Sequence, residues 1–168
     1  RLEARLANGA TLATAWLAIA ELTSTIRCGH TFPNPSNQRA AVAQAVFART
    51  PRVPFHFRWI DGRMIVTRDV SAEGAFPRGT EVLAINGTPA ATILARLLPY
   101  GRADGGNVAK RVASLAPQPG ERWSAFDVYY PLVFAPPPSG AWRFRVRRPG
   151  ARAREVAAAP ATAAQRAA

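Results

Sequence analysis

The sequence predicts an α+β fold in which an N-terminal helical segment precedes a domain built mainly from strands. Apolar residues recur at helical spacing over the first 50 residues, and from residue 52 onward they alternate with a period of two. Asp61-Gly62 and Asn86-Gly87 favour tight hairpin turns between antiparallel strands. With 168 residues and 48% hydrophobic content, the chain is long enough to bury a core.

Two helices are predicted before residue 50. The first is indicated by apolar residues at helical spacing, namely Leu12, Trp16, Ile19 and Leu22 to Ile26. Gly29 is expected to end this helix. Ser36 or Asn37 is expected to cap a second helix that runs to Phe47. Since helical periodicity then gives way to strands, we place a domain boundary near residue 50, between segments 1–50 and 51–157.

A hairpin is predicted directly after this boundary. Large apolar side chains alternate with other residues at Val53, Phe55, Phe57 and Trp59, which predicts a strand with one buried face. Asp61-Gly62 supplies the turn, and Met64 and Val66 belong to the return strand.

A second strand, turn and helix follow at residues 81 to 98. Val82, Leu83 and Ile85 form a short apolar run, and Asn86-Gly87 ends it with a turn. Thr88 is expected to cap a helix, with Pro89 at the first helical position, where its missing N–H has no cost. The helix would carry the apolar residues Ile93, Leu94, Leu97 and Leu98.

This strand, tight turn and proline-started helix resemble the second half of a PDZ domain. The other interpretation is an unrelated α+β domain that contains such a turn. The resemblance implies a PDZ-like, partly open β-barrel over residues 51–157, with an insertion at about 99–140. In that family the helix forms one wall of a peptide-binding groove.

The insertion and the end of the chain carry further predicted elements. Asn107 to Leu115 is expected to be a helix, Trp123 to Phe134 a strand, and 136–140 a stiff proline-rich linker. Trp142 to Val146 reads as a half-buried edge or surface strand, with Arg143, Arg145 and Arg147 on its exposed face. A short strand over 154–157 is expected next. Residues 158–168 carry no large apolar side chain, which predicts a tail or linker.

The net charge of +12 raises the question of nucleic-acid binding. All basic residues but Lys110 are arginine, and alanine is also abundant, a pairing typical of a GC-rich genome. No recognition motif accompanies the charge, so we expect no nucleic-acid partner.

No apolar run is long enough for a membrane span, and a single cysteine excludes an internal disulfide. We predict no cofactor and no metal site. Because the chain begins at Arg1 rather than Met, we expect a segment upstream of it.

Residues 29–31 carry the most specific chemical signal. Gly29-His30-Thr31, at the end of a helix and ahead of a PDZ-like domain, resembles the front part of the C-terminal processing peptidases, or tail-specific proteases, and of the tricorn-like serine peptidases. Their usual motif is Gly-Asp-Gly-His-Thr, whereas Cys28 here stands in place of the acidic residue. The resemblance implies that His30 acts as general base to a serine. The alternative is that His30 caps a helix and binds loop carbonyls. Cys28 is either a nucleophile or small packing filler.

No serine in the chain lies in a nucleophile-like motif, and Lys110 reads as a solvated charge. The resemblance implies that a later catalytic domain supplies the serine. We therefore expect a non-catalytic N-terminal and PDZ-like portion of a periplasmic or secreted serine peptidase. The alternative is a stand-alone PDZ-like binding or scaffold protein.

The PDZ-like groove is the second candidate site. It would bind peptide or protein C-termini with an apolar last residue as an added strand, through the residues Arg52, Val53, Phe55, Phe57, Ile93, Leu94 and Leu97. Pro51 and Pro54 remove backbone donors, so Arg52 is expected to hold the carboxylate. The alternative is a closed groove in a domain that only positions the catalytic domain.

Overall fold

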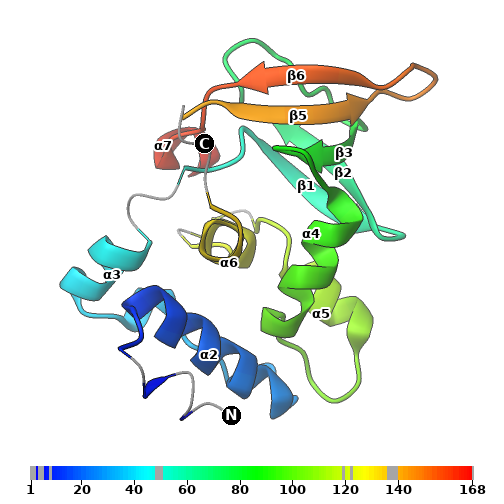
Figure 1. Ribbon diagram of the computed structural model, residues 1–168. Coiled ribbons are helices and arrows are strands. Elements are labelled where there is room, and N and C mark those ends of the chain that lie inside the picture. The colour runs from blue at the N-terminus through cyan, green and yellow to red at the C-terminus, as the bar shows by residue number, and fades with distance from the viewer. Residues whose placement is uncertain are drawn as a thin grey trace.

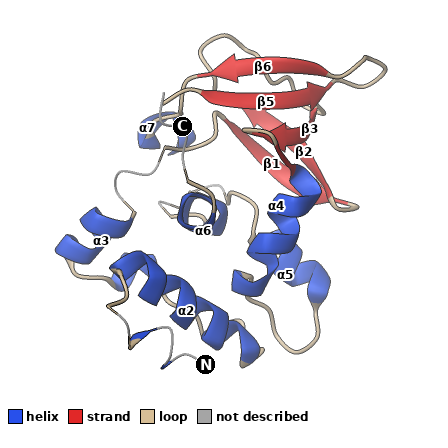
Figure 2. Cartoon of the chain, in the orientation of Figure 1, coloured by secondary structure: helices blue, strands red, loops and turns tan. Residues whose placement is uncertain are grey.

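Figure 1 shows the computed structural model, which describes residues 3, 6–7, 9–47, 51–118, 120–121, 123–135 and 140–167. Helices and antiparallel strands are mixed, which is consistent with the predicted α+β class. The helices gather on one side of the sheet (Figure 2). The predicted boundary near residue 50 and residues 136–139 of the predicted proline-rich linker lie outside the described residues. No helix in the described ranges has the length and apolar character needed to cross a membrane.

The front of the chain forms α2 (Leu12–Thr25), the short 3-10 helix η1 (Pro35–Asn37) and α3 (Ala40–Val46). The Thr11 hydroxyl caps α2 by accepting a hydrogen bond from the Thr14 N–H at 3.1 Å. The predicted cap at Ser36 or Asn37 is wrong. Asn34 provides a cap instead, for η1, and the start of α3 has no side-chain cap bond.

α2 is a helix as predicted, but several of its large aliphatic residues face outward. Trp16 and Ala20 are buried, and the Trp16 ring packs edge-on against Phe47 with centroids 4.8 Å apart. Four large apolar side chains of α2 and its C-terminal end are exposed, namely Leu12, Ile19, Leu22 and Ile26. Periodicity identifies a helix, but it does not say which of two apolar faces meets the core.

The strands form one antiparallel sheet in the order β1-β2-β3-β5-β6, with β4 paired to β3. They comprise β1 (Phe55–Ile60), β2 (Arg63–Asp69), β3 (Glu81–Ile85), β4 (Thr88–Pro89), β5 (Trp142–Arg147) and β6 (Arg154–Ala158). β1 and β6 lie at opposite ends of this order. The sheet is therefore not closed into a barrel, which corrects the expectation of a partly open barrel.

Both predicted glycine turns are present. Asp61 and Gly62 have φ of 49° and 73°, and Asn86 and Gly87 have φ of 48° and 80°. Positive φ at both central residues is what a two-residue hairpin turn of type I′ requires. The side chain of Asn86 also accepts a hydrogen bond from the Arg143 N–H at 2.9 Å, which ties this turn to β5.

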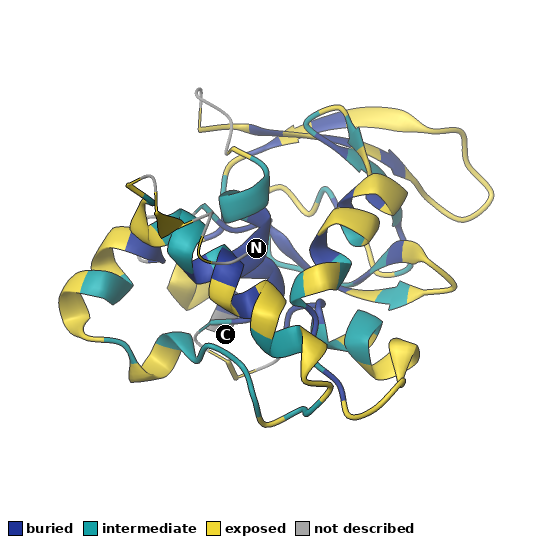
Figure 3. Cartoon of the chain, turned by 60° about the horizontal axis from the view of Figure 1, so that its bottom comes forward, coloured by how far each residue is buried: buried dark blue, intermediate teal, exposed yellow. Residues whose placement is uncertain are grey.

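The predicted alternation of β5 is confirmed, because its residues are buried and exposed in turn. β5 nevertheless lies between β3 and β6, so it is not an edge strand. Its buried side chains join the core with Phe55 and Phe76, whose rings pack 4.9 Å apart. Figure 3 shows the buried residues gathered in the interior and the exposed ones along the outer faces of the helices.

α4 (Ala90–Leu97) begins one residue later than predicted. Thr88 and Pro89 are extended and pair with Ile85 and Ala84 as β4. Thr88 therefore cannot serve as the helix cap, and Pro89 occupies the cap position rather than the first helical one. Pairing of these two residues with β3 therefore prevents the helix from starting at Pro89.

Residues 123 to 134 depart most from the prediction. They form α6 (Ala125–Val133) rather than a strand, whereas α5 (Val108–Ser114) is helical as expected and is capped by Asn107. Five consecutive residues of α6, from Phe126 to Tyr130, are buried. A helix that is buried on all sides shows neither a helical nor an alternating pattern of apolar residues. Pro131 lies inside α6, where proline is unfavourable for a helix.

α6 occupies the centre of the molecule in Figure 1, between α2, α4 and the sheet. Its Phe126 packs edge-on against Phe57 of β1, with centroids 4.8 Å apart. On its other side, Arg96 of α4 lies 4.7 Å from the centroid of the Phe134 ring, directly after α6. α6 therefore joins β1 to α4.

The predicted tail contains structure. α7 (Ala163–Ala167) begins with a reciprocal pair, in which Gln165 N–H donates to the Thr162 hydroxyl at 3.1 Å and Thr162 N–H donates to the Gln165 side chain at 2.8 Å. This is a capping box, which the Thr-x-x-Gln spacing could have indicated. Just before it, the Ala161 N–H donates to the carbonyl of Arg52 at 2.9 Å.

Arg166 of α7 is buried within a polar network. Its guanidinium donates to Asp127 Oδ2 of α6 at 2.9 Å and to the carbonyl oxygen of Phe55 in β1. Ser124 also donates to Asp127 Oδ2, at 2.7 Å. The Arg166 carbonyl lies 3.1 Å from His56 Nε2. The end of the chain is thereby fixed to both α6 and β1, so it is not the solvated tail that its composition predicted.

Lowering the pH from 7 to 5 is expected to destabilise the wild-type chain more than a His56→Gln variant. Burial, followed by the positive charge of Arg166, lowers the pKa of His56 below its ordinary value. In the unfolded chain histidine binds its proton with a pKa of about 6.5. Below that pH the unfolded state binds more protons than the folded state, so the free energy of unfolding falls.

Urea unfolding at the two pH values measures this difference. If His56→Gln shows the same pH dependence as wild type, burial of neutral His56 is not its cause.

Candidate functional site

His30 lies in the exposed loop between α2 and η1. α2 ends before Gly29, because Ile26 is its C-cap and Arg27 adopts a positive φ of 56°. The Thr31 N–H donates to the Cys28 carbonyl at 3.1 Å, which makes a tight turn around His30. The imidazole therefore projects from a turn rather than from the helix end itself.

This turn is held against the loop that precedes α5. The Gly29 N–H donates to Asp104 Oδ1 at 2.7 Å, and the Gly105 N–H donates to the Arg27 carbonyl at 2.8 Å. A Cβ at position 29 would lie 3.0 Å from both carboxylate oxygens of Asp104, so glycine permits this close approach. The Gly-His-Thr motif thus meets a carboxylate that is distant in the sequence.

Asp104 is also paired with Lys110, which the sequence suggested to be a solvated charge. Lys110 Nζ lies 2.6 Å from Asp104 Oδ2, and both side chains are about half exposed. The hydrogen bond from Lys110, followed by that from the Gly29 N–H, lowers the pKa of Asp104. Exposure makes this pair a modest contributor to stability, but it fixes the direction of the carboxylate.

Cys28 faces the same cluster. Its pKa is lowered by hydrogen bonds, the largest effect coming from the Thr31 side chain and the next from His30. Ligand atoms of Cys28, His30 and Asp104 all lie within 4.8 Å of one another. The structure therefore brings together a sulfur, an imidazole nitrogen and a carboxylate oxygen.

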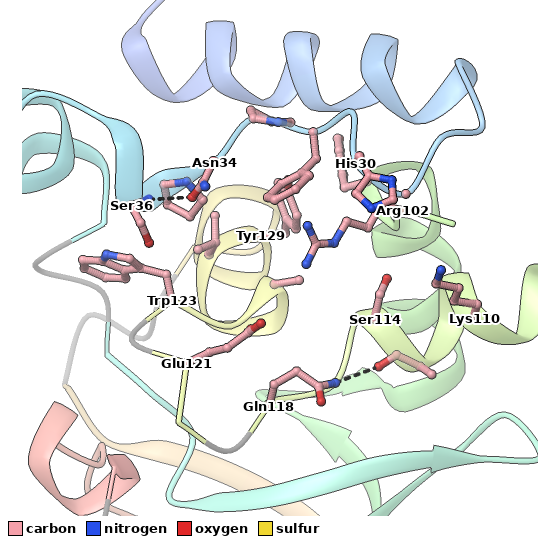
Figure 4. A pocket seen from close by; sticks show the side chains of 18 of the residues that line it. His30, Asn34, Ser36, Arg102, Lys110, Ser114, Gln118, Glu121, Trp123 and Tyr129 are labelled. Atoms are coloured by element: carbon pink, nitrogen blue, oxygen red, sulfur yellow. Dashed lines mark hydrogen bonds between the residues drawn. The ribbon is translucent and has the colours of Figure 1, made fainter. Parts of the chain in front are cut away.

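A cavity of about 1050 Å³ opens beside His30. Figure 4 shows its side chains converging from the loop after α2, from α5 and from α6. Among them are His30, Arg58, Arg102, Glu121, Trp123 and Tyr129. Arg102 lies over the Phe32 ring, 3.7 Å from its centroid. The cavity thus combines aromatic walls with basic side chains.

Tyr129 of α6 forms part of the apolar wall of the cavity. Its ring stacks on Tyr100 with centroids 5.2 Å apart. Burial raises the pKa of Tyr129, and nearby Arg102 only partly offsets this. The phenol is therefore a neutral hydrogen-bonding group near neutral pH.

The residues expected to bind a peptide in the groove lie mostly in the core. The fully buried ones are Val53, Phe55, Phe57, Ile93 and Leu97, and Leu94 is half-buried. α6 packs against Phe57 of β1 and contacts α4, the two elements expected to border an added peptide strand. In this conformation these side chains are not accessible to a ligand.

Arg52 is buried as well. Its guanidinium carbon lies 5.5 Å from the centroid of the Trp123 ring, and its carbonyl accepts from Ala161. None of the groove residues lines the cavity beside His30.

Sequence reasoning missed Asp104 and Tyr129. No local motif marks them, because each lies in a segment distant from His30.

Comparison of the sequence with known families and with curated proteins finds no match. Solved structures do match. The mature CPAF complexed with lactacystin has a TM-score of 0.56 at 15% identity, over 94% of this chain and 27% of that one. A CPAF mutant with a serine replaced by alanine has a TM-score of 0.54 at 18% identity, over 93% and 26%. The chain spans about a quarter of the length of these structures, and its fold is similar to that part of them.

Proposed function

We propose that this chain is a portion of a serine peptidase of the tail-specific type, and that it supplies His30 as the general base to a serine on a catalytic domain outside the chain. The observation that carries this proposal is the position of His30, exposed in a fixed turn at the edge of a large cavity. Support also comes from the Gly29-His30-Thr31 motif and from the fold likeness to CPAF, a serine protease of the tail-specific family.

The chemistry suits an imidazole in this place. Its ordinary pKa lies near neutral pH, so it can accept the proton of a serine hydroxyl as the hydroxyl attacks a carbonyl. An exposed ring can be reached by a serine on another domain. Among the described residues, no serine hydroxyl is hydrogen-bonded to a histidine. We therefore expect the nucleophile to come from elsewhere.

The exposed apolar residues of α2 support a second domain as partner. Leu12, Ile19, Leu22 and Ile26 have exposed fractions between 42% and 57%. Exposed apolar side chains on one helix are typical of a surface that another protein segment covers. α2 ends directly before the His30 turn, so a domain docked on it would lie close to His30.

We also propose that substrates with a free C-terminus bind in the His30 cavity rather than between β1 and α4. Arg58 and Arg102 offer charge-assisted hydrogen bonds to a carboxylate, and Trp123 and Tyr129 offer apolar contact. Most residues of the alternative groove are buried. A periplasmic or secreted location, which the tail-specific resemblance implies, belongs to the same proposal.

A peptide with an apolar, free C-terminus is expected to bind the isolated chain at least about tenfold more tightly than its C-terminally amidated twin. An Arg102→Gln variant should lose this preference, whereas Arg145→Gln, on the exposed face of β5, should keep it. Isothermal titration of both peptides measures the ratio. Equal affinity of the two peptides for wild type would contradict carboxylate recognition.

The isolated chain should not cleave peptides, whereas the longer protein should, and a serine-directed reagent should abolish that activity. If the longer protein binds peptides without cleaving them, the stand-alone or scaffold function replaces this proposal. Cleavage by the isolated chain that the reagent inhibits would also overturn it.

A further inference from the structure

We infer that Cys28, His30 and Asp104 form a binding site for a divalent transition-metal ion, with zinc as the ion that the ligand set fits best. The sequence analysis predicted no metal site. Asp104 is separated by 75 positions from Gly29, the residue between the two other ligands. Only the contact between the His30 turn and the loop before α5 brings the three ligands together.

The distances are close to those that zinc requires. Bonds from zinc measure about 2.3 Å to sulfur and about 2.0–2.2 Å to nitrogen or oxygen, so ligand atoms around a tetrahedral ion lie roughly 3.3–3.8 Å apart. Here the three ligand atoms lie within 4.8 Å of one another. His30 and Asp104 are exposed and Cys28 partly so, and shifts of about 1 Å or less would complete the bonds.

The ligand types select a transition metal. A thiolate disfavours magnesium and calcium, which take oxygen ligands, whereas sulfur with imidazole suits zinc and its substitute cobalt. Three protein ligands leave a fourth position for water or another molecule. A site with an open position is expected at an exposed surface such as this one.

One backbone and one side-chain hydrogen bond hold the carboxylate ligand in place without an ion. Gly29 N–H and Lys110 Nζ each donate to one oxygen of Asp104, at 2.7 Å and 2.6 Å. Each carboxylate oxygen has a further lone pair that can bind a metal. A second hydrogen bond between the two loops, from the Gly105 N–H to the Arg27 carbonyl, holds them side by side. The cost of assembling the site is thereby reduced.

Titration of the reduced, metal-free chain with Co²⁺ tests the site directly. One equivalent should produce the intense near-ultraviolet absorption of thiolate-to-cobalt charge transfer and the visible bands of tetrahedral cobalt. Zn²⁺ should abolish both by displacement. Absence of these bands, or bands that need many equivalents, would overturn the inference.

Variants distinguish binding of the ion by three ligands from binding by the Cys28 thiol alone. Cys28→Ser should abolish the charge-transfer band, and His30→Gln and Asp104→Asn should each weaken Zn²⁺ binding by at least about tenfold. His56→Gln and Glu73→Gln change a histidine and a carboxylate elsewhere, and they should bind like wild type. Circular dichroism of each variant checks the fold. Wild-type affinity in Asp104→Asn would refute the three-ligand site.

One consequence rests on the proposed function. A metal ion on His30 occupies the nitrogen lone pair that would accept the serine proton, so Zn²⁺ should inhibit the longer protein. Inhibition should need about tenfold more Zn²⁺ in Asp104→Asn, which retains His30. If the isolated chain binds Zn²⁺ but activity is unaffected, the metal site stands and the role of His30 as base fails.

Discussion

Replacing His30 by alanine in the longer protein is expected to lower kcat by roughly 10²-fold or more, with KM little changed, as for loss of a general base. The imidazole would accept a proton only while the serine attacks, so its loss affects the reaction step rather than substrate binding. Steady-state kinetics with a peptide substrate measure both constants. The turn around His30 is fixed by bonds from backbone atoms of Gly29 and Gly105, so the substitution should leave the fold intact.

Added imidazole provides the sharper control for this experiment. A small base that diffuses into the space left by His30 should restore part of the activity of His30→Ala and leave wild type unaffected. Glu73→Ala, in the exposed loop after β2, should retain wild-type kinetics. A kcat in His30→Ala equal to that of wild type would leave His30 with the structural role of a turn residue.

Replacing Arg166 by methionine is expected to destabilise the isolated chain by about 3–5 kcal/mol, because it leaves a buried carboxylate without its partner. Arg166 and Asp127 are about 5% exposed and lie 2.9 Å apart. Methionine keeps much of the length and apolar stem of arginine, so the change removes mainly the charge and its donors. Urea unfolding followed by circular dichroism measures the loss.

The double variant Arg166→Met with Asp127→Asn should recover much of this loss. No unpaired charge then remains, and buried ion pairs as such contribute little net stability. Asp127 Oδ1 and Arg166 Nε already lack hydrogen-bond partners among the described groups, which further lowers the net stabilisation that this ion pair provides. Arg152→Met, at an exposed position, should change stability by less than about 0.5 kcal/mol. A similarly small effect of Arg166→Met would mean that α7 is not docked in solution.

Several elements could be predicted from the sequence because short-range chemistry decides them. Asn86-Gly87 and Asp61-Gly62 tolerate positive φ, and that local property makes both hairpin turns. The alternation in β5 follows from one buried face, and Asn107 caps α5 through its own side chain. The Gly29-His30-Thr31 motif likewise marked the loop at the cavity without any knowledge of the fold.

Contacts between distant segments decided the rest. Phe126 to Tyr130 carry no periodic signal, because α6 packs against Phe57 of β1 and also contacts α4 and α2. Most residues of the expected peptide groove are likewise buried in the core. A composition of small residues after 158 suggested a tail, yet a capping box begins α7, and the buried Arg166 anchors this helix to α6 and β1. The position of Asp104 beside His30 depends on the packing of two loops that are 75 residues apart in the sequence.

The sequence by itself therefore determined the turns, the strand alternation and the histidine loop, because interactions within a few residues cause each of them. Only the tertiary structure decided which groups meet at His30, because those contacts depend on how the segments pack.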